Sequence, residues 1–203
     1  MMDVKELSIT PKALTMNLTM INRNVTMIIV VIIDPTKERF EMRKIVTFLW
    51  FNNQAKEAVD FYVSLFEDAK IINTTYLTES VAKAAGKKPG DISAIDFELN
   101  GQNFTALNGG PLYTFSEAIS IAVYCKTQEE IDKLWDALTE GGEVLSCGWL
   151  KDKYGLTWQI VPECLDIMMR DPDPVKAERV SAAMLRMEGK LMIRELEKAY
   201  RGE

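Results

Sequence analysis

The stretch AVDFYVSLF, residues 58–66, decides the fold, because it continues a helical pattern that begins directly after a strand. Apolar side chains recur at positions 55, 58, 59, 62, 65 and 66, which places them on one face of a helix. Asn52 and Asn53 supply a predicted N-cap. The preceding run KIVTFLWF, residues 44–51, is almost entirely apolar and predicts a strand covered on both faces.

A hairpin completes this first half of the chain. Residues 70–78 predict a strand, and the Gly, Pro and Lys content of AKAAGKKPGD, residues 82–91, predicts a loop. Residues 92–99 and 102–107 are β-prone and flank Asn100-Gly101, a strong signal for a two-residue hairpin turn.

The same order of elements returns after NGGP, residues 108–111, which we interpret as the joint between two halves. Residues 118–125 predict a strand, and Thr127 and Glu130 form a capping box before a helix that contains Trp135 in its apolar face and ends at Gly141. Strands follow at 143–150 and 156–161, and Asp152 and Lys153 are expected in a solvated turn between them. Strand, helix and strands therefore occur twice.

This pattern predicts a domain over residues 42–162, with modules at about 43–109 and 116–162. Residues 1–41 are interpreted as an N-terminal extension that need not be ordered; the alternative is an extra strand that pairs with the edge of a partner's sheet. Within them, VTMIIVVII (25–33) predicts a strand and is too short to cross a membrane as a helix. Residues 163–203 predict a helical tail in which Asp173 and Pro174 start a helix, with Val180, Met184, Met187 and Leu191 at helical spacing and a methionine-rich stripe for packing.

Composition excludes several classes of function. The chain has 24 Lys and Arg against 30 Asp and Glu, a net charge of −6, so neither nucleic acid nor an anionic membrane is an expected partner. It contains no histidine, which removes His-dependent catalysis and His-containing metal sites. Three widely spaced cysteines, Cys125, Cys147 and Cys164, are expected to be packing residues in a reducing cytoplasm.

Three strings carry a resemblance to a known family. AVDFYVSLF resembles the A-x-x-FY-x-x-LF helix of the vicinal-oxygen-chelate (glyoxalase/bleomycin resistance/extradiol dioxygenase) superfamily. LNGGP (107–111) and CGWLKDKYGLTWQIVP (147–162) are similar to its PhnB-like branch, often named as a 3-demethylubiquinone methyltransferase-type domain. The resemblance extends over about residues 43–200. It implies an α+β fold of paired βαβββ modules with C-terminal helices, and a homodimer, since modules of this superfamily commonly pair across subunits.

The resemblance also indicates where a metal would lie. Members that bind a metal use one ligand from each of four strand positions, which fall near Thr47, Asn108, Ser120 and Gln159 in this chain. Neutral hydroxyl and amide oxygens bind transition metals weakly. The sequence therefore predicts neither a metal nor another cofactor.

Strand alternation points independently to the same residues. Ser120 shares a face with Tyr124 on the predicted strand 118–125, while Thr47 and Gln159 lie among apolar neighbours. A mostly apolar pocket with a few polar groups is typical of small-molecule sites, and Trp side chains can stack on planar ligands. The alternative is that the polar groups face solvent or bond each other. The predicted ligand-binding residues are Thr47, Trp50, Asn108, Ser120, Tyr124, Trp149 and Gln159.

Three functions stay open at this point. The first is a metal-independent protein that binds a small apolar or aromatic molecule. The second is an enzyme using Asp96, Glu98 or Tyr124 for acid–base chemistry; methyl transfer is disfavoured because no Gly-rich nucleotide loop on a Rossmann-like unit is present for S-adenosylmethionine. The third is a structural or regulatory dimer without a ligand.

Overall fold

The computed structural model describes residues 14–22, 25–33 and 45–203. The chain divides into two compact units, Met1–Ile45 and Val46–Glu203. In the first unit, β1 (Leu14–Asn22) and β2 (Val25–Ile33) pair as antiparallel strands, and β2 coincides with the apolar run predicted as a strand. The rest of the predicted extension, at 1–13, 23–24 and 34–41, lies outside the described residues.

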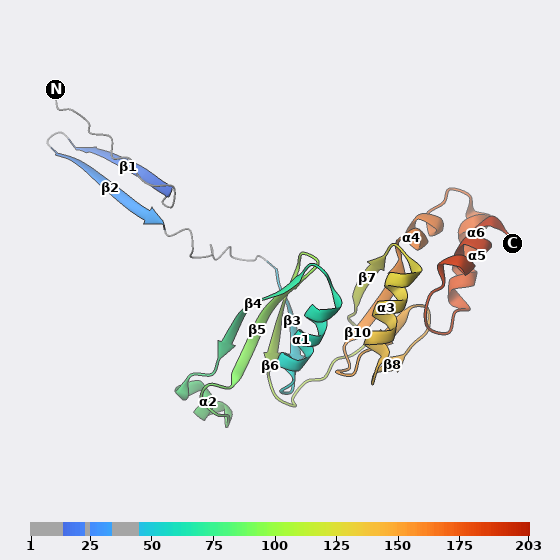
Figure 1. Ribbon diagram of the computed structural model, residues 1–203, viewed down its shortest axis with the longest axis horizontal. Helices are drawn as coiled ribbons and strands as arrows, with labels where there is room; N and C mark the ends of the chain where they lie inside the picture. Colours follow the sequence, from blue (N-terminus) through green and yellow to red (C-terminus); the bar gives the residue numbers. More distant parts are fainter. Residues whose placement is uncertain (1–13, 23–24, 34–44) are drawn as a thin grey trace. The chain divides into compact units, whose positions relative to one another are not determined.

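The first module of the second unit is a four-stranded sheet with a helix. Its strands have the order β3-β6-β5-β4, with β3 parallel to β6 and the other pairs antiparallel. Helix α1 packs against this sheet (Figure 1). The elements are β3 (Thr47–Phe51), α1 (Ala55–Leu65), β4 (Ala69–Tyr76), α2 (Glu79–Ala85), β5 (Ile92–Leu99) and β6 (Gln102–Asn108).

The second module repeats this plan. Its sheet has the order β7-β10-β9-β8, with β7 parallel to β10, and α3 packs against it (Figure 1). Apart from the short helix α2, both modules are βαβββ units, so the predicted α+β class is confirmed. The elements are β7 (Ile121–Cys125), α3 (Gln128–Thr139), β8 (Glu143–Val144), β9 (Trp149–Lys151) and β10 (Thr157–Pro162).

Three helices follow the second sheet: α4 (Glu163–Met169), α5 (Pro174–Leu185) and α6 (Ile193–Arg201). They enclose a small core of their own, against which Met168, Met184 and Met187 pack as predicted. Met169 and Met192, which belong to the same predicted methionine-rich stripe, are instead 38% and 41% exposed. The Asp173 side chain accepts a hydrogen bond from the Val175 amide, which confirms it as the N-cap of α5. The helical spacing predicted to continue to Leu191 is wrong beyond Leu185, where α5 ends.

Three other local predictions need correction. The strand predicted at 118–125 begins only at Ile121, where β7 starts. Helix α2 occupies the first part of the predicted loop 82–91 and ends at Gly86, which has a φ of 65°. The predicted strand 143–150 is interrupted between β8 and β9, because Cys147 and Gly148 adopt φ values of 59° and 83°. Their amides donate instead to the carbonyls of Met187 and Gly189, so pairing with a distant segment replaces pairing within the sheet.

Each sheet has an inner face, which carries its helix, and an outer face. In the first sheet the inner face includes Leu49 and Phe51, and in the second it includes Trp158 and Ile160. Both inner faces contribute to one continuous core, in which Tyr62 of α1 lies against Trp158 with ring centroids 5.3 Å apart. The outer faces are therefore the surfaces that the helices α1 and α3 leave uncovered. No helix among the described residues is long and apolar enough to cross a membrane.

Candidate functional site

Four of the predicted ligand-binding residues meet on the outer face of the second sheet. Gln159 of β10 stands opposite Trp149 of β9 and Ala122 of β7, so these positions share a face. The Gln159 Nε2 donates to the Ser120 Oγ at 2.7 Å, and Tyr124, two residues beyond Ala122, is 53% exposed. Ser120, Tyr124, Trp149 and Gln159 therefore form a polar pair beside two aromatic side chains.

Thr157 adds a buried hydroxyl to this face. It lies two residues before Gln159 and opposite Lys151, whose ammonium contacts Glu117 at 2.5 Å and Glu143 at 3.3 Å. The Thr157 side chain is fully buried, and its Oγ1 has no hydrogen-bond partner among the described residues. An unpaired buried hydroxyl costs about 1–3 kcal/mol, so this position carries unused hydrogen-bonding capacity.

Trp50 lies on the outer face of the first sheet, opposite Leu107. Its indole Nε1 donates to the Gly110 carbonyl at 2.8 Å, and its ring meets Tyr113 edge-on with centroids 4.9 Å apart. A Cβ atom at Gly109 would stand 2.3 Å from the Trp50 ring, so only glycine fits there. Trp50 thus holds the joint between the modules in place.

The two remaining predicted residues belong to the framework of the first module. Thr47 lies on the inner face, in line with Leu49 and Phe51. The Asn108 Oδ1 accepts from the Ala55 amide at 2.9 Å, and its Nδ2 donates to the Ile92 carbonyl at 3.0 Å. Asn108 therefore provides the acceptor for a backbone amide in the first turn of α1. The prediction that Asn52-Asn53 cap this helix is wrong.

These placements do not fit a metal ion. Thr47 faces the core, Asn108 uses both ends of its amide to join α1 to β5, and Ser120 and Gln159 bond each other. Within the part of the chain that the structure describes, no three His, Cys, Asp or Glu side chains gather closely enough to share an ion. The four positions offer neutral oxygens that already serve the fold, which makes them a poor donor set for a transition metal.

Asp152 is a structural residue that the sequence pattern missed. It is only 3% exposed, so its predicted place in a solvated turn is wrong. Its Oδ2 accepts from the Tyr62 hydroxyl at 2.7 Å and the Trp158 indole at 2.9 Å, and its Oδ1 accepts from two backbone amides. Burial raises the pKa of Asp152, and these hydrogen bonds oppose that rise. The signal in the sequence was the order Asp-x-x-Gly, typical of an aspartate that bonds its own turn.

The carboxylates considered for acid–base chemistry lie on the outer face of the first sheet. Asp96 stands opposite Thr105, whose Oγ1 donates to the Asp96 Oδ1 at 2.6 Å. Glu98 lies two residues further along β5, 3.6 Å from the Lys70 ammonium. Tyr124 belongs to the other sheet.

Comparisons with known proteins agree with this architecture. A family model described as 3-demethylubiquinone-9 3-methyltransferase matches residues 43–161, so the match ends before α4, short of the extent of about 43–200 predicted from the motifs. A Bacillus cereus structure titled as a PhnB protein of that methyltransferase type is 36% identical; the alignment covers 59% of this chain and 99% of that chain, with a TM-score of 0.53.

Two structures with lower sequence identity also match part of the chain. The fosfomycin resistance protein FosX from Listeria monocytogenes is 14% identical over 59% of this chain and 92% of its own, with a TM-score of 0.41. A glyoxalase/bleomycin resistance protein from Albidiferax ferrireducens is 13% identical over 58% and 95%, with a TM-score of 0.38. A comparison with curated proteins gives no match.

Proposed function

The chain belongs to the 3-demethylubiquinone-9 3-methyltransferase (PhnB-like) family, and on that premise we propose that it binds a small apolar or aromatic molecule without a metal ion. The observation that carries the proposal is the group on the outer face of the second sheet. There Gln159, hydrogen-bonded to Ser120, stands opposite Trp149, and Tyr124 is exposed on the neighbouring strand β7.

The chemistry of this group supports a planar ligand with one polar atom. Because the Gln159 Nε2 donates to Ser120, the Gln159 Oε1 is left as an acceptor that a ligand could use. Tyr124 and Trp149 offer ring surfaces for stacking, and the Thr157 hydroxyl lies on the same strand face. A few oriented polar groups among apolar surface are typical of small-molecule sites.

A second copy of the chain completes this proposal. Large apolar side chains are exposed on the outer faces, among them Phe48 at 66% and Tyr124 at 53%, and such surfaces are typical of protein interfaces. We propose a homodimer in which the partner covers these faces. Sedimentation analysis at micromolar concentration is expected to give about twice the mass of 23.0 kDa. A monomer at every concentration would contradict the dimer.

Neither methyl transfer nor a membrane or nucleic-acid partner is part of the proposal. The family name describes a methyltransferase, yet the sequence has no Gly-rich loop of the kind that binds S-adenosylmethionine in Rossmann-like folds. Titration calorimetry with S-adenosylmethionine is expected to give no binding heat.

Three free thiols, one of them buried, support a reducing compartment such as the cytoplasm.

A ligand screen tests the proposal. Native mass spectrometry and thermal shift against a library of small apolar and aromatic molecules are expected to yield a ligand that binds equally well with and without EDTA. Trp149→Ala and Gln159→Met are each expected to weaken its binding by about tenfold, the scale of one stacking or hydrogen-bond contact. Val175→Ala, an exposed apolar position on α5, is the matched control and should leave binding unchanged.

Two results would contradict the proposal. One is the absence of any ligand in a broad library. The other is binding that EDTA abolishes, because the site would then require a metal.

A further inference from the structure

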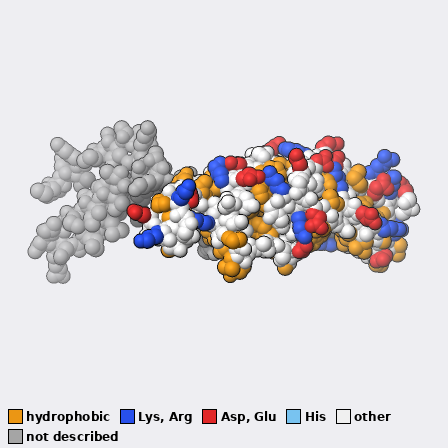
Figure 2. All heavy atoms as spheres, turned by 90° about the horizontal axis from the view of Figure 1, so that it is seen from below, with side chains coloured by type: hydrophobic (Ala, Val, Ile, Leu, Met, Phe, Trp, Pro, Cys, Tyr) orange, Lys and Arg blue, Asp and Glu red, His pale blue; other side chains and the backbone are white. Residues whose placement is uncertain are grey.

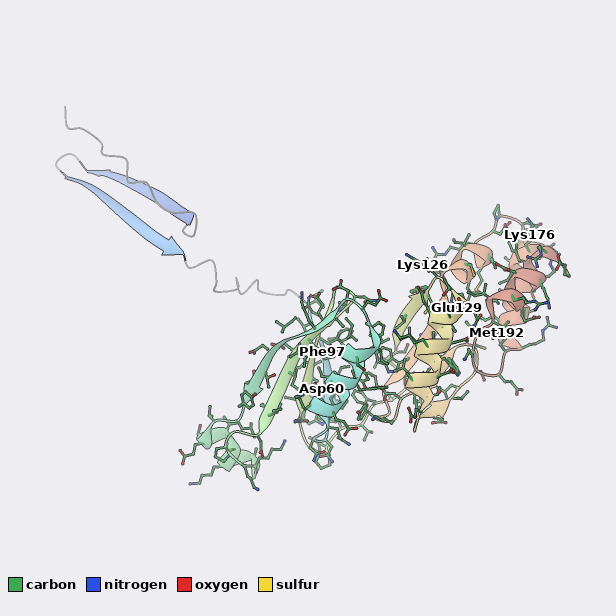
Figure 3. All side chains as sticks on the ribbon, viewed as in Figure 1. Asp60, Phe97, Lys126, Glu129, Lys176 and Met192 are labelled. Atoms are coloured by element: carbon green, nitrogen blue, oxygen red, sulfur yellow. The ribbon has the colours of Figure 1, made fainter. Side chains whose placement is uncertain are left out.

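A cleft of about 460 Å³ opens between the two modules, and neither Ser120 nor Gln159 lines it. One wall comes from the end of α1 and the turn that follows it, together with Asn100 in the β5–β6 turn. The other wall comes from the end of β7, the first turns of α3 and the first residue of α4. Lys126, labelled in Figure 3, marks the point where β7 passes into α3. The volume lies within the 300–1,000 Å³ range of small-molecule sites.

The floor of this cleft is apolar. Leu134 and Cys125 are buried, and Leu65, Phe66 and Val123 are half-buried. Phe66 is held in position by stacking on Trp158, with ring centroids 6.4 Å apart and an interplanar angle of 24°. A ligand with an apolar body would therefore meet a preformed surface.

The rim is charged, and negative groups outnumber positive ones. Four carboxylates, Glu67, Asp68, Glu130 and Glu163, face two ammonium groups, Lys126 and Lys133. None of the ion pairs found among residues 45–203 involves any of these six side chains. On the face shown in Figure 2, positive and negative side chains are interspersed.

The charge is also unevenly distributed between the walls. Both lysines belong to the wall formed by β7 and α3, so the α1 wall, with Glu67 and Asp68, is purely acidic. Helix α1 ends at this wall with no basic residue in its last turn, so the negative end of its dipole is uncompensated there. A cation is favoured at the α1 wall.

We propose that this cleft binds an organic cation with an apolar body, such as a protonated arylalkyl amine. The apolar part lies on Leu65, Phe66 and Val123, and the ammonium lies between Glu67, Asp68 and Glu163. Tyr124 lines this cleft and also belongs to the outer-face group of the proposed function, whereas Ser120, Trp149 and Gln159 do not line it. The proposal does not depend on the proposed function, because the ammonium and the apolar body contact other residues.

The pKa of a thiol in the cleft floor agrees with a negative electrostatic potential inside the cleft. The pKa of the Cys125 thiol is raised to about 11, first by burial and then by the nearby carboxylates of Glu130 and Glu163. Those carboxylates disfavour any additional negative charge in the cleft, and the negative potential that they create favours a cation.

A matched pair of probes tests the proposal on the full chain. 4-Phenylbutylammonium and 5-phenylpentanoate differ in the sign of their charge and carry the same phenylbutyl group. Amide chemical-shift mapping is expected to show the ammonium perturbing residues 65–68 and 123–126, with affinity that falls as salt is added. The carboxylate probe is expected to bind at least about fivefold more weakly, the scale of one exposed charge contact.

Charge-removing variants complete the test. The double variant Glu67→Gln/Asp68→Asn and the single variant Glu163→Gln are each expected to weaken ammonium binding by about threefold or more. Glu178→Gln, an exposed carboxylate on α5 outside the cleft, is the control and should bind like the wild type. Equal binding of both probes, no binding, unchanged affinity in the rim variants, or shifts centred on Trp149 and Gln159 would each overturn the proposal.

Discussion

The carboxylate of Asp152 receives four hydrogen bonds in the interior, and two of them come from side chains that belong to different modules. Tyr62 reaches it from α1 of the first module, and Trp158 reaches it from β10 of the second. A sequence window shows only an aspartate between two lysines in a Gly-containing turn. Its burial could not be predicted, because it depends on a contact across 90 residues.

Replacement of Asp152 by Asn should show the effect of this buried carboxyl. An amide N–H would face the Tyr62 and Trp158 donors, so we expect a loss of about 1–3 kcal/mol in unfolding free energy. The raised pKa means that folded Asp152 holds its proton more tightly than unfolded Asp152. Its stabilising contribution is therefore full below its ordinary pKa of 3.8 and declines as pH rises through the folded value.

Urea unfolding of both proteins across this pH range checks the sign. The difference in unfolding free energy between wild type and Asp152→Asn should shrink as pH rises and then stay constant. Asp60→Asn, at an exposed position on α1, is the comparison that corrects for general effects of charge removal. A difference that grows with pH would contradict the prediction.

Asn108 is the second residue whose role comes from the fold. We expect Asn108→Ala to lower the unfolding free energy by about 1–2 kcal/mol, because the Ala55 amide at the start of α1 and the Ile92 carbonyl both lose a partner. Asn53→Ala, at the cap position favoured by the sequence, should cost less, since no side chain of the residues just before α1 caps this helix. Chemical denaturation measures both, and a larger loss for Asn53→Ala would argue against this assignment.

At the scale of elements, local patterns were sufficient for the β5–β6 turn and the start of α3, but not for helix α2, which was predicted as a loop. The Asn100-Gly101 turn joins β5 to β6 as predicted, and Thr127 accepts the Glu130 amide at the start of α3. The interruption between β8 and β9 was not predictable, because Cys147 and Gly148 bond to residues near position 188. The same holds for the site: alternation predicted the shared face of Ser120 and Tyr124, while the framework role of Asn108 required the tertiary structure.

Two glycines give a matched test of the β8–β9 interruption. Gly148 and Gly155 both have a positive φ, at 83° and 85°, so alanine is strained at each. A Cβ at Gly148 would also lie 2.9 Å from the Ile160 carbonyl oxygen, whereas nothing lies within 4 Å at Gly155. We expect Gly148→Ala to be less stable than Gly155→Ala by about 1 kcal/mol or more in thermal or urea unfolding. Equal losses would show that crowding at Gly148 is relieved without cost.

At the scale of the whole molecule, the two modules share one core, and the N-terminal hairpin belongs to a separate unit. The repeat of strand, helix and strands could be predicted from the sequence. Which face of each sheet joins the shared core could not. That face depends on contacts such as Tyr62 with Trp158, which join the two halves.

This division predicts the result of a truncation. A chain that starts at Val46 should keep the thermal transition of the full chain to within about 2 °C, because Val46–Glu203 is a compact unit of its own and contains the core described above. Differential scanning calorimetry compares the two proteins directly. A chain that ends at Pro162 serves as the contrast: it loses Leu191 and the bonds of Gln128 to residues 191 and 193, and should melt at a lower temperature. A large loss on removing residues 1–45 would contradict the assignment of two units.

The burial of Trp158 has a practical consequence for anyone who handles this protein. Its indole is shielded completely and lies beside Tyr62, at the place where the two modules meet. If the modules separate while each stays folded, this indole enters water and its fluorescence emission moves to longer wavelength. The chain therefore carries an intrinsic optical reporter of the junction, which a variant with the other three tryptophans replaced by phenylalanine would isolate.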